Sequence, residues 1–385
     1  MGPKMTGSVT CSCLFGSPER PVSLAVSLRV LELVNFRIFA AATFRPEPEG
    51  TTVITGPNGT GKTSVLEALV YLSTQRSFRG APREALIRTD ETRAIVRAEL
   101  SHEAAPTLVE AEIVATGRSR TQVNRKTASA RKDLAAATPC TIFSPEDLAI
   151  VSGGPAGRRQ LLDDALALVD APGARAADAV EKVLRQRAAL LRQAGGRVTA
   201  DVAATLDVWD QRLAESAEIL VDARERLVRD LDRHVGPAYG RLAGSEGRLV
   251  VTEKYQRSWE GDLLDALTDH RGDDIRRGVN TVGPHRDELI LAIDGREART
   301  HASQGEQRCL ALALRIGVHR LVGEKTNLVP TLLLDDVFSE LDPTRSQALV
   351  AELPGGQSIL TTAVPLPDGI EVARIVAINE VTTTT

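Results

Sequence analysis

The sequence predicts a mixed α/β fold with mixed sheets, interrupted by a helical subdomain. Short segments of alternating apolar residues dominate the first 150 residues, and similar segments return near the C-terminus. Between them, from Gly157 to about Leu242, apolar residues recur every three or four positions with charges on the opposite face, which is typical of amphipathic helices. We therefore expect one α/β core that a helical insert divides into two parts.

The N-terminal part of the core is predicted to span residues 28–152. It contains one prominent helix after Lys62, where Val65, Leu66, Leu69 and Val70 share one face. Its expected strands are "LRVLELVNF", "TTVITG", "AIVRAEL", "LVEAEIVA" and "TPCTIFS". Residues 1–27 show no such pattern, and we expect them to form a disordered extension.

The helical insert is predicted at 153–278 and the C-terminal part of the core at 279–385. Two long helical segments are expected in the insert, broken by "APGA" and "QAGGR", because glycine and proline end helices. Strand character returns with "RLVVTE" and "ELILAID". A helix from Ser303, the strand "LVPTLLLDD", a helix opened by Pro343 and the strands "QSILTTA" and "ARIVAI" follow.

The composition limits the class of protein. Of 385 residues, 42% are hydrophobic and 25% charged, as in an ordinary soluble protein, and no apolar run is long enough to span a membrane. Aromatic residues make up 3%, which argues against base stacking as the main mode of nucleic-acid binding. The net charge of −4 means that a DNA site would need a local basic patch. The four cysteines show no metal-ligand spacing, so we expect a reduced, cytoplasmic protein.

The segment "GPNGTGKT" matches the phosphate-binding P-loop pattern between an expected strand and an expected helix. Glycines let backbone N–H groups turn toward phosphate oxygens, and the start of the helix adds positive potential. Lys62 is expected to reach the β- and γ-phosphates of ATP, and Thr63 to be a ligand of Mg²⁺. The expected nucleotide-binding residues are Gly56, Pro57, Asn58, Gly59, Thr60, Gly61, Lys62, Thr63 and Ser64.

The segment "TLLLDD" predicts a buried strand that ends in two carboxylates. Asp335 stands where a P-loop ATPase places the acid that holds Mg²⁺. Asp336 is expected to orient the attacking water or accept its proton. We therefore expect Asp335, Asp336 and Lys62 to be the catalytic residues, and Thr63 and Asp335 to hold the metal.

The segment "SQGEQR" has the residues of a capped helix start, since Glu306 follows Ser303 at the spacing of a capping box. A Ser-x-Gly-x-Gln helix start shortly before an acidic strand also resembles the signature segment of ABC-type ATPases, which normally reads LSGGQ. Here Ala302 replaces the leucine and Gln304 the first glycine. "SELD", which ends at Asp342, resembles the D-loop that follows in these proteins.

The ABC resemblance implies an ATPase head in which the signature helix contacts nucleotide held by the P-loop of a second head. The chain has one P-loop and one signature segment, so two complete sites would require an ATP-dependent homodimer. The residues implied to contact this nucleotide are Ser303, Gln304, Gly305 and Asp342.

A closer resemblance, to the RecF family of bacterial recombination mediators, spans roughly residues 28–378. It rests on "LELVNFRIF", "FSPEDLAIVSGGPAGRRQLLD", "RQRAALLRQ", "VGPHRDEL", "ASQGEQRCLALALR" and "LLLDDVFSELD". It implies a slow, DNA-dependent ATPase that binds double-stranded and gapped DNA. It also implies that the protein works with RecR and RecO to load RecA. The processes implied are DNA repair, replication, recombination and the SOS response.

The chain departs from transporter ATPases at two catalytic positions. Asp336 stands in place of the usual glutamate, and Thr361 and Thr362 lie where transporter ATPases have a histidine. RecF-like proteins share the double aspartate. No glutamine that would form a Q-loop lies between Phe143 and Asp147.

The segment from Gly117 to Lys132 is the first DNA-binding candidate, because it holds six basic residues and no acidic one. Such a run would contact phosphates independently of sequence and make binding salt-dependent. Arginines after the P-loop helix, among them Arg83 and Arg88, form a second candidate. The residues predicted to bind DNA are Arg118, Arg120, Arg125, Lys126, Arg131, Lys132, Arg76 and Arg79.

Three other features of the sequence leave alternatives. His285 in the "VGPHRDEL" turn is expected to be structural rather than catalytic, and Arg158 and Arg159 fit either packing or DNA contact.

Two other functions fit a P-loop and signature: the ATPase subunit of a transporter, which would lack the insert, and an anti-phage effector, which would need a separate nuclease. A longer chromosome-maintenance head is disfavoured because the insert is too short for an extended coiled-coil arm.

Overall fold

The computed structural model describes residues 24–101, 106–128, 130–197, 199–244 and 250–381. Residues 1–23 of the expected disordered extension lie outside this range. The last residues of the expected extension do not fit that expectation, because Leu24–Ala25 form strand β1 and strand β2 begins at Ser27. Strand β1 pairs in parallel with β13 (Leu328–Val329), which gives the N-terminal residues a backbone partner far along the chain.

A five-stranded parallel sheet forms the centre of the head. Its strands, in spatial order, are β16 (Val372–Ala377), β4 (Gly50–Thr55), β15 (Gln357–Thr362), β14 (Thr331–Asp335) and β9 (Cys140–Phe143). Alternate residues of each inner strand face opposite sides, as the period of two requires. Thus Leu332 and Leu334 of β14 pack into one hydrophobic core and Leu333 into the other. The apolar runs predicted as buried strands are confirmed.

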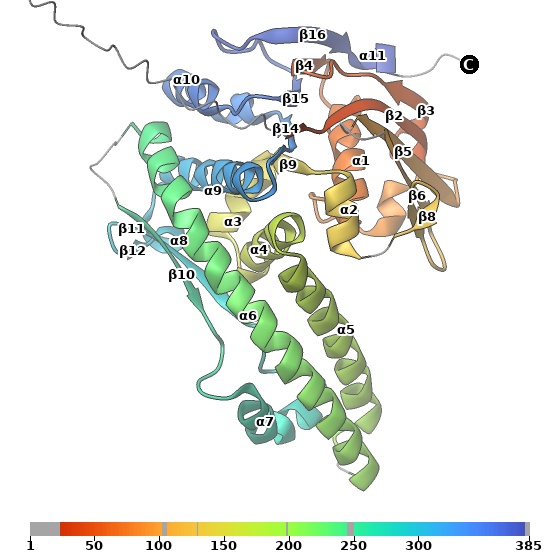
Figure 1. The fold of residues 1–385 in the computed structure, drawn as a ribbon, viewed down its shortest axis with the longest axis vertical. Coiled ribbons are helices and arrows are strands. Elements are labelled where there is room, and N and C mark those ends of the chain that lie inside the picture. Colours follow the sequence, from red (N-terminus) through yellow and green to blue (C-terminus); the bar gives the residue numbers. More distant parts are fainter. Residues whose placement is uncertain (1–23, 102–105, 129, 198, 245–249, 382–385) are drawn as a thin grey trace, which may run out of the picture.

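One face of the parallel sheet is covered by helix α1 (Lys62–Thr74) and a six-stranded antiparallel sheet (Figure 1). The order of this second sheet is β3 (Phe39–Phe44), β2 (Ser27–Phe36), β5 (Arg93–Ser101), β6 (Thr107–Val114), β7 (Arg120–Val123) and β8 (Lys126–Thr127). Alternating residues of β2, β5 and β6 are buried against α1, so the predicted half-buried strands here are also confirmed.

The other face of the parallel sheet packs on helix α9 (Gln304–Thr326), which in turn packs on the helices of the insert. The insert helices are α4 (Pro155–Val169), α5 (Ala171–Ala194), α6 (Ala200–Leu242) and α7 (Leu263–Arg277). Helices α5 and α6 pair and project from the head as an arm (Figure 1). The break predicted at "QAGGR" is confirmed, because Gly195 ends α5 in the left-handed conformation. The other break lies just before "APGA", at Asp170, and "APGA" itself forms the first turn of α5, where proline is tolerated.

A buried ionic cluster joins the helices of the arm. Arg187 of α5 is fully buried and pairs with Asp210 of α6 and Asp274 of α7. The Arg187 guanidinium also donates a hydrogen bond to the side-chain oxygen of Asn280. Asp210 forms a second ion pair, with Arg271. Removing one member would leave a buried charge without its partner, which is costly, so the cluster fixes how the three helices pack.

A three-stranded antiparallel sheet lies where the insert returns to the head. It consists of β10 (Val251–Gln256), β11 (Glu288–Ile293) and β12 (Arg296–Glu297). Strands β10 and β11 pair across the predicted boundary at residue 278, so the insert and the C-terminal part share this sheet. The remaining helices are α2 (Arg131–Ala137), α3 (Leu148–Ser152), α8 (Ala298–His301), α10 (Pro343–Glu352) and α11 (Ile378–Val381).

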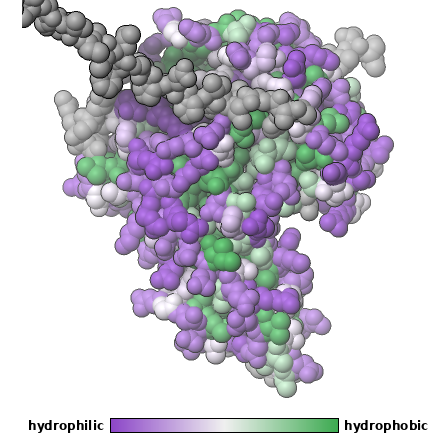
Figure 2. Space-filling view, in the orientation of Figure 1, coloured by the Kyte–Doolittle hydropathy of each residue, from purple (hydrophilic) through white to green (hydrophobic). Residues whose placement is uncertain are grey.

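The surface agrees with the composition. Figure 2 shows hydrophilic side chains over most of this face of the molecule, with hydrophobic ones in small separate groups. Within the described ranges, no helix is both long enough and apolar enough to cross a bilayer.

Candidate nucleotide site

The P-loop connects β4 to α1 in the order that the sequence predicts. Gly61 stands immediately before α1 with φ 97°, a conformation that side chains rarely adopt. A Cβ at Gly61 would also lie 2.7 Å from Ile38 Cδ1 and 2.8 Å from Phe39 Cζ. Both the backbone angle and the space therefore require glycine here, and the loop ends at a helix start suited to an anion.

The acidic strand places its first carboxylate against the start of α1. Thr63 donates a hydrogen bond of 2.9 Å to Asp335 Oδ1, and Thr361 of the neighbouring strand β15 donates one of 2.6 Å to the same oxygen. Asp335 is 4% exposed, and burial raises its pKa. Lys62 is also buried, and its Nζ donates to the backbone oxygens of Gly56 (2.7 Å) and Pro57 (2.9 Å). The predicted residues Lys62, Thr63 and Asp335 are therefore in one place.

Asp336 has an unusual backbone and an unpartnered side-chain oxygen. Its φ of 47° lies in the left-handed region, and its N–H donates to both the carbonyl and the hydroxyl oxygen of Thr361 at 3.1 Å. Its Oδ1 is buried without a hydrogen-bond partner among the described residues. A buried acceptor without a donor is rare in native proteins, and Asp336 is one of the residues that line the cavity above the P-loop.

This cavity has a volume of about 440 Å³ and opens above the P-loop. Such a volume is in the range of small-molecule and cofactor sites. Sequence reasoning named about half of its lining, namely Asn58, Gly59, Gly61, Lys62, Thr63, Ser64, Arg79 and Asp336. It named Arg79 for DNA rather than for this cavity, and it noted Thr361 only as a departure from transporter ATPases. It did not assign Arg37, Ile38, Ala85, Ile87 and Thr89 to the site.

Arg37 lines the cavity and is not predicted as a site residue from the sequence. Its guanidinium donates to both oxygens of Glu67 at 2.7 and 2.6 Å, and Glu67 is completely buried in α1. Ser77 donates to the same carboxylate. This bidentate pair fixes α1, and hence the P-loop, against the turn between β2 and β3. The only available signal was the position of "NFR" at the end of the first expected strand.

The signature residues do not join the P-loop cavity of their own chain. Ser303 precedes α9 and forms the predicted capping box: its Oγ accepts from the Glu306 N–H at 3.3 Å, and its own N–H donates to Glu306 Oε2 at 2.8 Å. Ser303 and Gln304 are exposed, and the cavity lining given above includes neither them nor Gly305. Asp342 also lies outside it, where its carboxylate caps α10 and pairs with Arg345 at 2.9 Å.

Arg79, which the sequence predicts to bind DNA, is exposed and lines the P-loop cavity. It pairs with Glu146 at 3.5 Å. Glu146 follows strand β9, beside the strand that carries Asp335, and its charge contributes to the raised pKa of Asp335. Glu146 thus occupies the region where no Q-loop glutamine is found.

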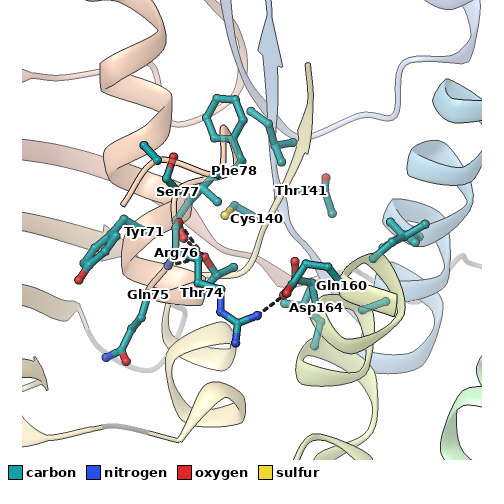
Figure 3. Close-up of a pocket in the computed structure, with 18 of the residues that line it drawn as sticks. Tyr71, Thr74, Gln75, Arg76, Ser77, Phe78, Cys140, Thr141, Gln160 and Asp164 are labelled. Carbon is teal, nitrogen blue, oxygen red and sulfur yellow. Dashed lines mark hydrogen bonds between the residues drawn. The ribbon is translucent and has the colours of Figure 1, made fainter. Parts of the chain in front are cut away.

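Arg76, also predicted to bind DNA, points into a second cavity of about 480 Å³ at the C-terminal end of α1 (Figure 3). There it donates to Gln160 of α4 and pairs with Glu181 of α5 at 2.9 Å. Asp164 lines the same cavity, and burial raises its pKa to about 6. Arg76 therefore links the P-loop lobe to the insert.

The basic segment 117–132 divides into two groups. Arg118, Arg120, Arg125 and Lys126 are exposed around the β7–β8 hairpin and form no ion pair with the described residues. Arg131 is different, because its side chain is 14% exposed and pairs with Asp178 (2.9 Å) and Glu181. Lys132 pairs with Asp133 at 2.7 Å. The hairpin residues remain a candidate DNA surface, whereas Arg131 links α2 to α5.

The residues of the "VGPHRDEL" turn take structural positions, as the sequence favours for His285. His285 Nε2 and the Arg286 guanidinium both contact the carbonyl oxygen of Asn280, at 3.1 and 2.9 Å. Burial lowers the pKa of His285 to about 4, so this imidazole is neutral at physiological pH. Arg158 is buried and pairs with Glu288 at 2.7 Å, and Arg159 donates to the carbonyl oxygen of Asp287 at 2.6 Å, so both take part in packing.

The donor set of the P-loop cavity fits a nucleoside triphosphate with Mg²⁺. The Thr63 hydroxyl and the Asp335 carboxylate are oxygen ligands, which Mg²⁺ prefers, and Mg²⁺ in such sites takes only one or two protein ligands beside phosphates. No cluster of three or more His, Cys, Asp or Glu side chains suited to a metal occurs in the described part of the chain. The unpartnered Asp336 oxygen leaves one acceptor free for a water or a cation.

Comparison with known proteins gives matches over nearly the whole chain. The family model "RecF/RecN/SMC N terminal domain" matches residues 27–360. The DNA replication and repair protein RecF of Beutenbergia cavernae is 39% identical, over 90% of this chain and 96% of that protein. The protein of the same name from Acidothermus cellulolyticus is 37% identical, over 91% and 97%. A solved structure of the recombination mediator protein RecF with ATP in the RecFOR pathway has a TM-score of 0.78 at 28% identity, over 90% of this chain and 96% of that chain.

Proposed function

The chain belongs to the RecF family, and we propose that it is an ATP-controlled recombination mediator that binds DNA as a dimer. The family supports an ATPase head of the ABC type and a role in DNA repair and replication. The observation that carries the proposal is the division of the site. The P-loop cavity contains Lys62, Thr63 and Asp336, while the signature residues lie outside it on the same chain.

ATP binding is assigned to the loop Gly56–Ser64. Its backbone N–H groups and the start of α1 would hold the phosphates. Lys62, which bonds to the loop's own carbonyl oxygens at 2.7 and 2.9 Å, would exchange these for phosphate oxygens. Mg²⁺ would be held by Thr63 and Asp335 and would neutralise charge on the phosphates.

Hydrolysis is assigned to Asp336 as the residue that orients water. Asp336 lines the cavity, its Oδ1 has no hydrogen-bond partner among the described residues, and its backbone N–H donates to Thr361 at 3.1 Å. A carboxylate without a hydrogen-bond donor is well suited to accept a hydrogen bond from water. We expect slow, DNA-dependent hydrolysis that works as a switch rather than as a source of continuous work.

Dimerisation is assigned to the signature segment and the D-loop. Ser303, Gln304 and Gly305 form the start of a long helix, which attracts anions, and two of them are exposed. A second chain would bring its bound ATP to this helix start and to Asp342, so that two chains enclose two ATP molecules.

DNA binding is assigned to the β7–β8 hairpin through Arg118, Arg120, Arg125 and Lys126, which have no acidic partners among the described residues. Double-stranded or gapped DNA is the expected ligand, held by its phosphates. We further propose a cytoplasmic protein that works with RecR and RecO in loading RecA.

Two substitutions test the proposal by separating ATP binding from dimerisation. Lys62→Ala should abolish both ATP binding and ATP-dependent dimerisation. Ser303→Arg places a bulky cation at the exposed helix start and should leave ATP binding intact while preventing dimerisation. Labelled-ATP titration measures the first property and light scattering with a non-hydrolysable analogue the second.

Arg299→Ala is a matched control, since Arg299 is exposed in the short helix α8 just before the signature segment. It should dimerise like the unsubstituted protein. Normal ATP-dependent dimerisation of the Ser303→Arg variant would refute the divided site.

A further inference from the structure

The glycine of the signature segment has a neighbour that explains it within a single chain. Gly305 lies in the first turn of α9 with a right-handed helical conformation, so no special backbone angle requires glycine there. Glycine within a helix is less favourable than alanine, because it loses more backbone freedom on folding. A reason other than conformation is therefore needed.

The reason is the Arg345 guanidinium. A Cβ at Gly305 would lie 2.7 Å from both terminal nitrogens of Arg345 and 2.9 Å from its Cζ, closer than Cβ atoms approach other atoms in proteins. The guanidinium thus lies directly against the backbone of the signature turn. It also lies near Cys309, one turn further along α9, and its charge lowers the pKa of that thiol against the larger raising effect of burial.

The same arginine is tied to the D-loop. Asp342 Oδ1 accepts from the backbone N–H of Arg345, and Asp342 Oδ2 accepts from its guanidinium, both at 2.9 Å. The backbone hydrogen bond and the nearby guanidinium hold the pKa of Asp342 below its usual range. Arg345 therefore contacts both α9 and the start of α10, two elements that are separated in sequence by strand β14. A second contact lies beside it, because Arg308 of α9 pairs with Glu340 of the D-loop segment.

We propose that Arg345 is a positioning residue that holds the signature turn and the D-loop as one rigid surface for a second copy of this chain with bound nucleotide. This inference rests on the proposed dimer. Gly305 is glycine because its missing side chain leaves room for the guanidinium. Arg345 acts through the position of Ser303, Gly305 and Asp342 and not through the chain's own P-loop, whose cavity it does not line.

The test is a double-substitution cycle at Arg345 and Gly305. Arg345→Ala and Gly305→Ala should each weaken dimerisation with a non-hydrolysable ATP analogue by about tenfold or more, because each separates the guanidinium from the turn. The double variant should be no weaker than either single one, within about twofold. Arg345→Lys should recover part of the loss, since it restores the charge but not the planar group.

Two further measurements separate this role from a general structural one. Binding of labelled ATP to the monomer should stay within about twofold of the unsubstituted protein in every variant. Thermal unfolding of Gly305→Ala should be nearly unchanged, because the end of a flexible, 34% exposed side chain can move aside.

The outcomes distinguish this inference from the proposed function. If Ser303→Arg prevents dimerisation but Arg345→Ala does not, the divided site stands and the role of Arg345 is refuted. If Gly305→Ala weakens dimerisation as much in the Arg345→Ala background as alone, glycine serves another contact and the inference also fails. If the unsubstituted protein does not dimerise with ATP, both fall together. If Arg345→Ala does not fold, Arg345→Lys and Gly305→Ala decide the matter.

Discussion

Glu253→Gln should make the protein more stable at alkaline pH. Glu253 lies on β10, which packs against α6, and its two carboxylate oxygens are buried without hydrogen-bond partners among the described residues. Burial raises its pKa from 4.5 to about 8, and the neighbouring carboxylate of Asp232 on α6 adds to this effect. The folded protein therefore holds a proton at neutral pH that the unfolded chain has released.

The sign of the pH dependence follows from this difference. Between pH 4.5 and about 8 the folded state binds more protons than the unfolded state, so the free energy of unfolding falls as the pH rises and is level above pH 8. At 1.36 kcal/mol for each pH unit, the whole interval corresponds to about 5 kcal/mol. Glu253 is not completely buried, and solvent reduces the effect, so we expect about 2 kcal/mol.

Urea denaturation at pH 5, 6.5 and 8.5 measures the effect. Glu253→Gln cannot ionise, so its advantage over the unsubstituted protein should grow from pH 5 to pH 8.5 by about 2 kcal/mol. Asp232→Asn should give a smaller gain in the same direction, because it removes the neighbouring negative charge. Glu260→Gln, at an exposed position, is the matched control and should change nothing. Parallel pH profiles for Glu253→Gln and the unsubstituted protein would refute the reasoning.

Four other predictions follow from the described contacts. Arg187→Met leaves Asp274 buried without its cation and should lower the free energy of unfolding by about 3 kcal/mol in urea, and a loss below about 1 kcal/mol would argue against the cluster. Asp335→Asn should abolish the stabilisation by Mg²⁺ and ATP in thermal unfolding, about 2.7 kcal/mol at a ligand concentration of 100 Kd for the unsubstituted protein, and a retained shift would contradict the metal assignment. Removing Arg125 and Lys126 together should reduce the slope of log K for DNA against log salt by about 2, and an unchanged slope would exclude the hairpin from the DNA site. Asp164→Asn should stabilise the protein at pH 8 more than at pH 4, because burial raises the pKa of Asp164 to about 6. Equal gains at both pH values would show that ionisation of Asp164 does not contribute to the pH dependence of stability.

The fold and the nucleotide site could be predicted from the sequence where the determinants are local. The P-loop is a continuous segment, and its strand and helix carry their own apolar patterns, so Lys62 and Thr63 were placed from the sequence alone. Asp335 was placed because a buried strand of four apolar or small residues leads to it. The capping box at Ser303 and Glu306 is likewise a short-range pattern.

The remaining contacts depend on residues that are distant in sequence. Nothing near Arg131 shows that Asp178 and Glu181 neutralise it, because the pairing arises only when α2 packs against α5. The sequence predicts Arg79 as a DNA contact but gives no sign that the fold also places it in the lining of the P-loop cavity. The contact between Gly305 and Arg345 likewise joins two elements on either side of a buried strand. The charge runs thus show where basic residues are concentrated in the sequence. They do not show which of these residues lack an acidic partner in the fold.

The number of chains and nucleotides in the ATP-bound state tests the central claim most directly. Native mass spectrometry of the unsubstituted protein with a non-hydrolysable ATP analogue and Mg²⁺ would give both numbers at once, with ADP as the comparison. The divided site predicts that the protein with the analogue forms a species of two chains and two bound nucleotides. With ADP it predicts single chains. A single chain saturated with the analogue at every protein concentration, or a dimer that forms equally with ADP, would contradict it.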